Sequence, residues 1–286
     1  MTHADTLRAR LAGGETILMP GVWDPLSALL AEQAGFHTVF VSGFAVAGTL
    51  LGEPDIGILN QTHMAEVAQR VCVSVPEMCV IVDADTGYGD NGDVQRTTEL
   101  WQAAGAAGMF LEDQVWPKKC GHMEGKEVVP TNEWLAKLTT VRTRSPGMFL
   151  TARTDARAVN GLADALERGR MARDLGVDAV FVEAPQSLSE LDQIATALPD
   201  VVLVANMVEK GKTPLLTPSE LHDRGFSLIV SPLSGLLSMT KALGDAYARL
   251  REMGTLRDHL DTITAFDDFT DLVGLPKHLA NDAEQR

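Results

Sequence analysis

The sequence has little of what marks a secreted, membrane-spanning or nucleic-acid-binding protein. Its 286 residues include only three cysteines, Cys72, Cys79 and Cys120, an odd and low count that excludes a disulfide framework. No apolar run reaches the roughly 18 residues of a membrane span. Basic side chains number 24 against 39 acidic ones, and the net charge of −15 argues against a nucleic-acid partner, which needs a basic field.

Aromatic residues make up only 5 % of the chain, but the hydrophobic fraction of 45 % is normal for a packed core and excludes intrinsic disorder. The first residues, MTHADTLRARLAGG, lack the basic segment and apolar segment of a secretory signal. Together with the sparse cysteines, this pattern predicts a protein of the reducing cytoplasm with no membrane contact.

What the chain does contain is a regular alternation of short apolar runs and longer helical stretches. Runs that are apolar on both faces are typical of a covered parallel sheet, and their alternation with helices indicates βαβ units. Eight such units predict an α/β fold, a (β/α)8 barrel spanning residues 1–254. The expected strands are 17–19, 38–41, 79–82, 109–111, 149–152, 179–182, 201–204 and 228–230. The expected helices are 25–34, 64–73, 94–104, 133–142, 162–175, 188–198, 218–223 and 235–253.

Residues 255–286 follow the eighth helix and form a separate, partly amphipathic helical segment. Its apolar positions include Leu256, Leu260, Ile263, Phe266 and Phe269. The pattern is compatible with docking on a neighbouring subunit and, equally, with packing on the chain's own barrel.

Acidic residues follow the third and fourth expected strands, where a barrel places its active site. Asp83 and Asp85 are two residues apart and face the same way in extended geometry, which is costly without a cation between them. Glu112 ends the next strand, and Asp55 lies in the loop after the second one. An oxygen-only set favours Mg²⁺, with Mn²⁺ as the alternative, over zinc. The other interpretation is that these acids form loop salt bridges or helix caps.

The segment Lys118-Lys119-Cys120-Gly121-His122 follows the fourth expected strand. Neighbouring cations lower the pKa of a thiol, so Cys120 is a candidate acid/base or nucleophile. Gly121 and Gly125 would let this loop move, as active-site lids do.

Arg153 ends the fifth expected strand and is suited to a bidentate clamp on a carboxylate. The alternative is a structural salt bridge to Asp155 or Glu183. Glu183 is also placed to orient the thiol or the arginine, and Asn206 to donate to a substrate carboxylate.

Several motifs, in this order, resemble the isocitrate lyase/phosphoenolpyruvate mutase superfamily over roughly residues 16–250. They are Leu51-Gly52-Glu53-Pro54-Asp55, Asp83-Ala84-Asp85-Thr86-Gly87-Tyr88-Gly89, Leu111-Glu112-Asp113-Gln114, Lys118-Lys119-Cys120-Gly121-His122, Ala152-Arg153-Thr154-Asp155, Ala205-Asn206-Met207-Val208-Glu209 and Pro232-Leu233-Ser234. The resemblance implies a TIM barrel, Mg²⁺ dependence and a homotetramer, a dimer of dimers that swap their C-terminal helices. The small-molecule partner it implies is a carboxylate substrate.

The resemblance also implies roles for single residues. Asp85 would be the direct metal ligand, with Asp83, Glu112 and Asp55 acting partly through metal-bound waters, and residues 118–126 would form a gating loop. The catalytic candidates are Cys120 as acid/base, Arg153, His122 and Glu183. The substrate-binding candidates are Trp23, Ser42, Gly43, Asp83, Gly121, Arg153, Asn206 and Ser234.

The Lys118–His122 motif is similar to that of the lyase branch of the superfamily. It implies a Mg²⁺-dependent lyase that cleaves a 2-hydroxy di- or tricarboxylate, of the substituted malate or methylisocitrate type, into pyruvate or glyoxylate and a carboxylic acid. The residues after His122 depart from the usual methylisocitrate lyase loop, and Pro232 departs from the serine common in oxaloacetate hydrolases. Phosphonomutase chemistry at a P–C bond, oxaloacetate hydrolysis or decarboxylation, and a non-catalytic barrel are the alternatives.

Overall fold

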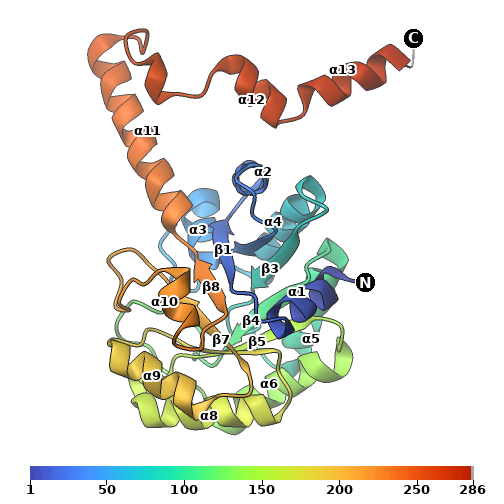
Figure 1. Ribbon diagram of the computed structural model, residues 1–286, viewed down its shortest axis with the longest axis vertical. Coiled ribbons are helices and arrows are strands. Elements are labelled where there is room, and N and C mark those ends of the chain that lie inside the picture. Colours follow the sequence, from blue (N-terminus) through green and yellow to red (C-terminus); the bar gives the residue numbers. More distant parts are fainter. Residues whose placement is uncertain (285–286) are drawn as a thin grey trace.

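Eight parallel strands close into a barrel in chain order, with β8 hydrogen-bonded to β1, in a computed structural model that describes residues 1–284 (Figure 1). This confirms the predicted (β/α)8 barrel. The strands are β1 (Ile17–Val22), β2 (Thr38–Val41), β3 (Cys79–Asp83), β4 (Gly108–Glu112), β5 (Phe149–Thr154), β6 (Ala179–Val182), β7 (Val202–Asn206) and β8 (Leu228–Ser231).

Each of the eight predicted helices is present and follows its strand, within about three residues of the predicted bounds. They are α2 (Pro25–Gln33), α4 (Gln61–Ser74), α5 (Asn91–Ala104), α6 (Thr131–Arg144), α8 (Leu162–Asp174), α9 (Leu188–Ala197), α10 (Pro218–His222) and α11 (Ser234–Met253). The sequence did not predict α1 (His3–Ala12), α3 (Gly43–Val46), the π-helical turn η1 (Ala47–Leu51) or α7 (Ala156–Val159). After α11 come η2 (Leu260–Thr262), α12 (Phe266–Leu272) and α13 (Leu275–Glu284).

Helix α5 ends at a glycine. Gly105 ends α5 in the left-handed conformation, with φ of 94°, and its N–H donates back to the last turn of the helix. A residue with a Cβ atom is strained there, which is why glycine is the common choice at this position.

The strands separate two cores, because alternate side chains point to opposite faces of the sheet. The outer core lies between strands and helices, and it includes Val80, Leu150 and Trp101. The inner core fills the barrel with residues such as Met19 and Phe149. Helix α1 closes the amino-terminal end of the barrel by adding Ala4, Leu7 and Leu11 to this inner core.

The same alternation positions the functional side chains. Several inward-facing series begin apolar and end polar at the carboxyl end of their strand, as in Cys79, Ile81 and Asp83 of β3. Other strands and the residues directly after them end in the same way, with Glu112, Arg153, Glu183 and Asn206. Polar groups from separate strands therefore converge at one mouth of the barrel.

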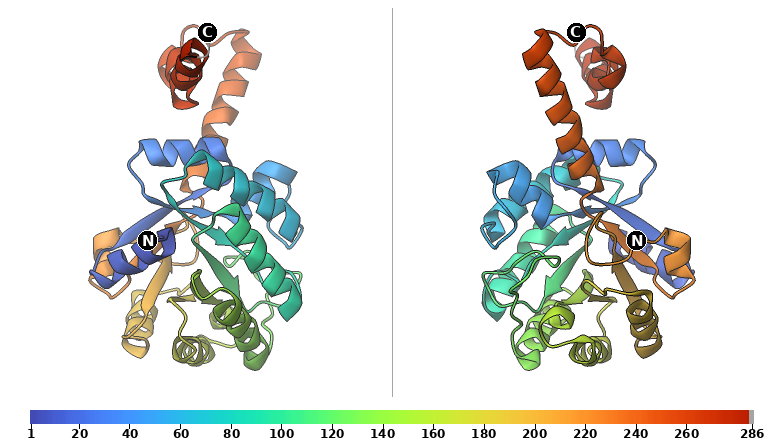
Figure 2. Two further views of the ribbon diagram at one scale, coloured as in Figure 1. Left: turned by 90° about the vertical axis from the view of Figure 1, so that its right-hand side faces the viewer. Right: turned by 90° about the vertical axis from the view of Figure 1, so that its left-hand side faces the viewer.

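The C-terminal arm, residues 237–280, projects from the barrel (Figures 1 and 2). Met239, near its start, still packs against the outer core, whereas residues 255–280 stay clear of the barrel in all three views. Leu236 is the one buried residue of α11, and none of residues 255–280 is buried. Within the described monomer, the segment therefore does not pack on its own barrel. No helix of residues 1–284 combines the length and apolar character needed to cross a membrane.

Candidate active site

A small cavity of about 40 Å³ lies at the carboxyl-terminal mouth of the barrel. Its floor is an apolar layer contributed by the four even-numbered strands: Phe40, Phe110, Phe181 and Val230. The rings of Phe40 and Phe110 have centroids 4.8 Å apart, and those of Phe110 and Phe181 5.8 Å apart. This space holds only a few water molecules, so a dicarboxylate needs the cover of the cavity to open.

One wall of the mouth is acidic. Asp83 faces the cavity, and its carboxylate accepts hydrogen bonds from the backbone N–H of Asp85 (3.1 Å) and of Gly43 (3.4 Å). A side chain at position 43 would put its Cβ 2.9 Å from Asp83 Oδ2, so this close approach requires glycine. Behind Asp83, Lys118 Nζ lies between Asp55 Oδ1 (2.6 Å) and Asp85 Oδ1 (2.7 Å).

The buried carboxylates of Asp85 and Glu112 fit a divalent cation. All four of their oxygens lack an aligned hydrogen-bond donor among the described residues, although Lys118 and Arg153 lie within ion-pair distance. Burial raises the pKa of Asp85 to about 7 and the pKa of Glu112 well above its usual value, because a charged form without solvent is unfavourable.

Within residues 1–284, no three His, Cys, Asp or Glu side chains converge into a complete metal cage. Mg²⁺ does not need one, since it keeps several waters and is commonly held by one or two carboxylates. The residues present therefore fit a hydrated Mg²⁺ ion held by Asp85 and its acidic neighbours.

The segment 118–126, which the sequence predicts to be a gating loop, covers the cavity with Cys120, Gly121 and His122. The two ends of this gating loop are joined by paired backbone. Gln114 and Val128 form an antiparallel bridge, and Val115 N–H donates to Glu127 O. The Gln114 side chain also holds the loop start, donating to Lys119 O (2.8 Å) and accepting from Lys119 N–H (3.0 Å).

Cys120 lines the cavity, but the expected lowering of its pKa is wrong. Burial, assisted by the carboxylates of Asp55 and Glu183, raises the pKa of the Cys120 thiol to about 11. The two lysines beside it in sequence do not help, because Lys118 pairs with acids and Lys119 Nζ donates to Gly125 O. The thiol is therefore protonated at neutral pH, which suits a general acid and not a thiolate nucleophile.

His122 also lines the cavity and is held in one tautomer. The backbone N–H of Lys212 donates to Nδ1 (2.9 Å), so the ring proton of neutral His122 is on Nε2, 3.5 Å from Glu183 Oε1. Burial lowers the pKa of His122, with Glu183 opposing and nearby cations reinforcing that shift.

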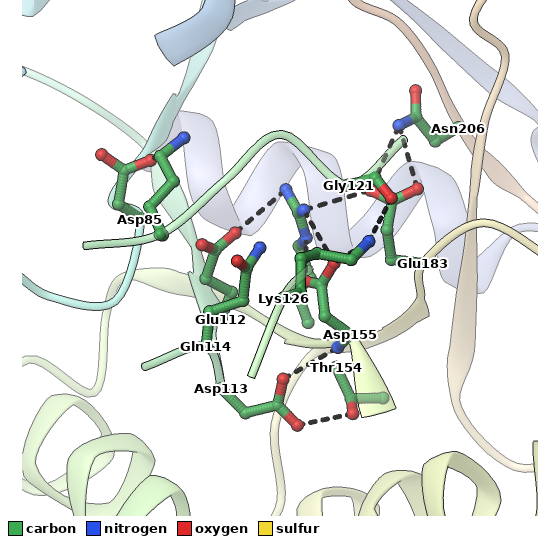
Figure 3. A network of polar contacts seen from close by, with 12 residues as sticks. Asp85, Glu112, Asp113, Gln114, Gly121, Lys126, Thr154, Asp155, Glu183 and Asn206 are labelled. Atoms are coloured by element: carbon green, nitrogen blue, oxygen red, sulfur yellow. Dashed lines mark hydrogen bonds and ion pairs between the residues drawn. The ribbon is translucent and has the colours of Figure 1, made fainter. Parts of the chain in front are cut away.

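Arg153 forms ion pairs with three carboxylates, those of Glu112, Asp155 and Glu183, which Figure 3 labels. Its guanidinium contacts Glu112 Oε2 (3.1 Å), Asp155 Oδ2 (3.0 Å) and Glu183 Oε2 (3.4 Å), and it lies over the Phe181 ring. Asn206 Nδ2 donates to both oxygens of Glu183 at 3.3 Å. The salt bridges expected as the alternative for Arg153 are thus present, and they leave the guanidinium facing the cavity.

Most of the predicted site residues meet at this mouth. Those that line the cavity are Ser42, Asp55, Asp83, Cys120, Gly121, His122, Arg153, Glu183 and Asn206. Asp85 and Glu112 are buried beside it, and Gly43 abuts Asp83. Trp23 and Ser234 are not brought to the cavity wall. The Trp23 ring lies against Gly235, and Ser234 Oγ bonds to Ser231 and Glu209.

The sequence reasoning missed two parts of the site. The aromatic floor is one, although the period-two pattern of the strands places Phe40, Phe110 and Phe181 on the inward face. The second is Lys126, whose buried ammonium lies beneath the gating loop. No local pattern marks this lysine, since its partner Asp155 is distant in sequence.

The comparisons with known proteins agree with this geometry. The family model described as "Phosphoenolpyruvate phosphomutase" matches residues 7–251. The chain is 48 % identical to the chloroplastic carboxyvinyl-carboxyphosphonate phosphorylmutase of Arabidopsis thaliana, over 91 % of this chain and 78 % of the relative. It is 38 % identical to the 2,3-dimethylmalate lyase of Eubacterium barkeri, over 97 % and 96 %.

Solved structures show the same similarity over the whole chain. Oxaloacetate acetylhydrolase in complex with 3,3-difluorooxalacetate superposes with a TM-score of 0.94 at 33 % identity, covering 99 % of this chain and 97 % of the other. Phosphonopyruvate hydrolase in complex with oxalate and Mg²⁺ superposes with a TM-score of 0.89 at 26 % identity, covering 99 % of both chains.

Proposed function

Because the chain belongs to the phosphoenolpyruvate phosphomutase family, an enzyme family, we propose that it is a Mg²⁺-dependent carbon–carbon lyase. Its substrate would be a small 2-hydroxy dicarboxylate such as a substituted malate, and its products an α-keto acid, pyruvate or glyoxylate, and a carboxylic acid. The observation that carries the proposal is the Cys120 thiol in a cavity that also has a buried acidic wall and the Arg153 guanidinium.

A metal ion held by Asp85, with Asp83, Glu112 and Asp55 around it, would supply Lewis-acid chemistry at the hydroxy-carboxylate end of the substrate. Ser42 and Gly43, which lie beside this wall, would contact that carboxylate. The buried carboxylates of this wall are placed to receive the hydroxyl proton.

Cleavage breaks the Cα–Cβ bond and leaves its electron pair on the departing acid as an enediolate. Arg153, fixed by Asp155 and Glu183, would stabilise this developing charge. Cys120 would then donate its proton to the carbanionic carbon as general acid. Closure of the gating loop keeps bulk water from that carbon.

The first experiment is a substrate panel with Mg²⁺: 2,3-dimethylmalate, methylisocitrate, isocitrate, citramalate and oxaloacetate, scored for release of pyruvate or glyoxylate. Cys120→Ser is expected to retain Mg²⁺ binding, measured by calorimetry, and to lose about 10²–10⁴-fold in kcat. Unchanged turnover in this variant would disprove the role given to the thiol.

A second candidate is chemistry at a P–C bond, which the name of the Arabidopsis relative favours. Phosphorus NMR of carboxyphosphonate and phosphonopyruvate substrates separates this reaction from C–C cleavage. Oxaloacetate hydrolysis is less favoured, because Pro232 lies on the cavity wall where a serine is common in those hydrolases, and it offers no hydroxyl.

We also propose that the protein is a homotetramer, a dimer of helix-swapped dimers, in the cytoplasm. The C-terminal arm supports this assembly, because it exposes Tyr247 (65 %), Leu260 (63 %) and Phe266 (80 %) to solvent in the monomer. Light scattering should give four times the chain mass of 30.8 kDa. Phe266→Asp should reduce that mass, and a wild-type monomer would contradict the proposal.

A further inference from the structure

Lys126 ends the gating loop with an ammonium group that is buried beneath it (Figure 3). Its Nζ lies 3.0 Å from Asp155 Oδ1 and donates a hydrogen bond to the carbonyl of Gly121. The side chains of Lys126 and Asp155 are 1 % and 0 % exposed. An ammonium is costly to bury without such partners, so this position of Lys126 is tied to the closed loop.

Asp155 connects the loop to the catalytic wall. Its carboxylate accepts hydrogen bonds from Arg153 Nε (3.0 Å) and Nη2 (3.3 Å), while its other contact is the ammonium of Lys126. The loop lysine and the cavity arginine therefore share one buried carboxylate. Withdrawal of the ammonium leaves Arg153 as the remaining cation beside it.

The Lys126–Gly121 bond places the part of the loop that carries the thiol. Gly121 adjoins Cys120 and lies so close to Glu183 that an added Cβ would be 2.5 Å from Glu183 Cδ. With Gly121 held there, its neighbour Cys120 lies against the cavity.

We propose that Lys126 is a positioning residue that latches the gating loop shut, and that through Asp155 it couples loop closure to the orientation of Arg153. The latch itself is a property of this chain's own contacts. Its effect on turnover rests on the proposed lyase function.

A second ion pair on the same loop provides a matched control. Glu124 pairs with Lys212, but the Glu124 side chain is 87 % exposed. Exposed pairs contribute little, because water solvates both charges when the pair is broken. Glu124→Gln therefore removes a loop-to-barrel ion pair without disturbing the latch.

The latch is tested without substrate by the rate at which iodoacetamide alkylates Cys120. Cys72 and Cys79 are buried, and burial raises their pKa values to about 11 and about 12, so Cys120 is the thiol that loop opening exposes. Lys126→Met should speed its alkylation at least tenfold, Lys126→Arg should restore a rate near wild type, and Glu124→Gln should stay within twofold. Equal rates for Lys126→Met and wild type would overturn the proposal.

Asp155→Asn keeps the test decisive if Lys126→Met does not fold, because it removes the acceptor charge from the barrel side. It should also speed alkylation at least tenfold, and a wild-type rate in this folded variant would contradict the latch.

Turnover is the second readout, measured with whichever panel substrate reacts. Lys126→Met should lower kcat at least tenfold at a temperature where circular dichroism shows the variant to be folded, with recovery in Lys126→Arg. If no panel substrate reacts, the proposed function fails, while the alkylation rates still decide on the latch.

Discussion

The two ends of the barrel are built from the same strands and the same inward-facing positions, yet they differ completely in chemistry. At the amino-terminal end, Leu7 and Leu11 of α1 close over apolar residues such as Met19 and Phe149. At the carboxyl-terminal end, the inward positions carry carboxylates, a guanidinium and an amide around a small cavity.

The difference shows how one scaffold separates stability from chemistry. Apolar contacts at the closed end are non-directional, and each buried side chain contributes by leaving water. Charges at the mouth are costly to bury unless each finds a partner of suitable geometry. The closed end therefore tolerates exchange between similar apolar residues, whereas the mouth requires particular groups at particular distances.

The largest stability effect is expected at the closed end. Leu7 is 1 % exposed in the inner core, and Leu7→Ala should reduce the free energy of unfolding by about 2–5 kcal/mol through lost burial and a cavity. Urea denaturation at fixed protein concentration measures this loss. The kcat of the folded variant should stay within twofold of wild type, since α1 lies at the opposite end from the cavity.

Val73→Ala is the control for this prediction, because Val73 is 73 % exposed on α4. It should change the free energy of unfolding by less than about 0.5 kcal/mol. A large loss of kcat in Leu7→Ala would show that the two ends are not independent.

A smaller effect is expected from Asp113, which supports the mouth from behind. Its carboxylate accepts hydrogen bonds from Thr154 Oγ1 (2.6 Å), Asp155 N–H (2.8 Å) and Arg168 Nη1 (3.1 Å), and so fixes the turn that carries Asp155. Burial nevertheless raises its pKa from 3.8 to about 6, with Asp155 adding to the shift.

Between pH 3.8 and about pH 6, the pKa values of Asp113 in the unfolded and folded chain, the folded chain holds more protons on Asp113 than the unfolded chain does. Its contribution to the free energy of unfolding therefore falls as pH rises through that window. Asp113→Asn lacks this titration, so the difference, variant minus wild type, should grow by roughly 2–3 kcal/mol from about pH 4 to about pH 6.5. Denaturation curves at both pH values test this, and parallel pH dependences of the two proteins would refute it.

The sequence predicted the barrel because the pattern of an apolar run followed by a helical stretch occurs eight times. All eight strands and their helices could be located from the apolar runs and the helical stretches between them, and errors at the ends did not change the order. Helix α1 was missed since its amphipathic signal is weak: it buries Ala4, Leu7 and Leu11 in a helix with a polar average. Its role depends on the closed barrel, which no local pattern shows.

The site was predictable in composition but less so in geometry. Asp83, Glu112 and Arg153 could be predicted as site residues because they end strands, and the carboxyl ends of barrel strands meet at one mouth. The pKa of Cys120 was misjudged, since nearness in sequence to Lys118 and Lys119 does not determine where their ammonium groups point. Such directions depend on tertiary partners, here Asp55 for Lys118.

The smallest effect is expected at His122, which links the gating loop to the segment after β7. Burial lowers its pKa below the ordinary 6.5, so the neutral ring is favoured in the folded chain. The stability it provides is fully present above about pH 6.5 and is lost as pH falls from there through the folded pKa, because the unfolded chain then binds more protons. Protonation of Nδ1 removes the acceptor for the Lys212 N–H.

Hydrogen exchange at the Lys212 amide, corrected for its intrinsic rate, should lose protection a few-fold between about pH 7.5 and about pH 5.5, in line with about 1 kcal/mol for one hydrogen bond. Amides of α8 should show no such change. Constant protection at Lys212 would mean that the loop at the mouth is held independently of His122.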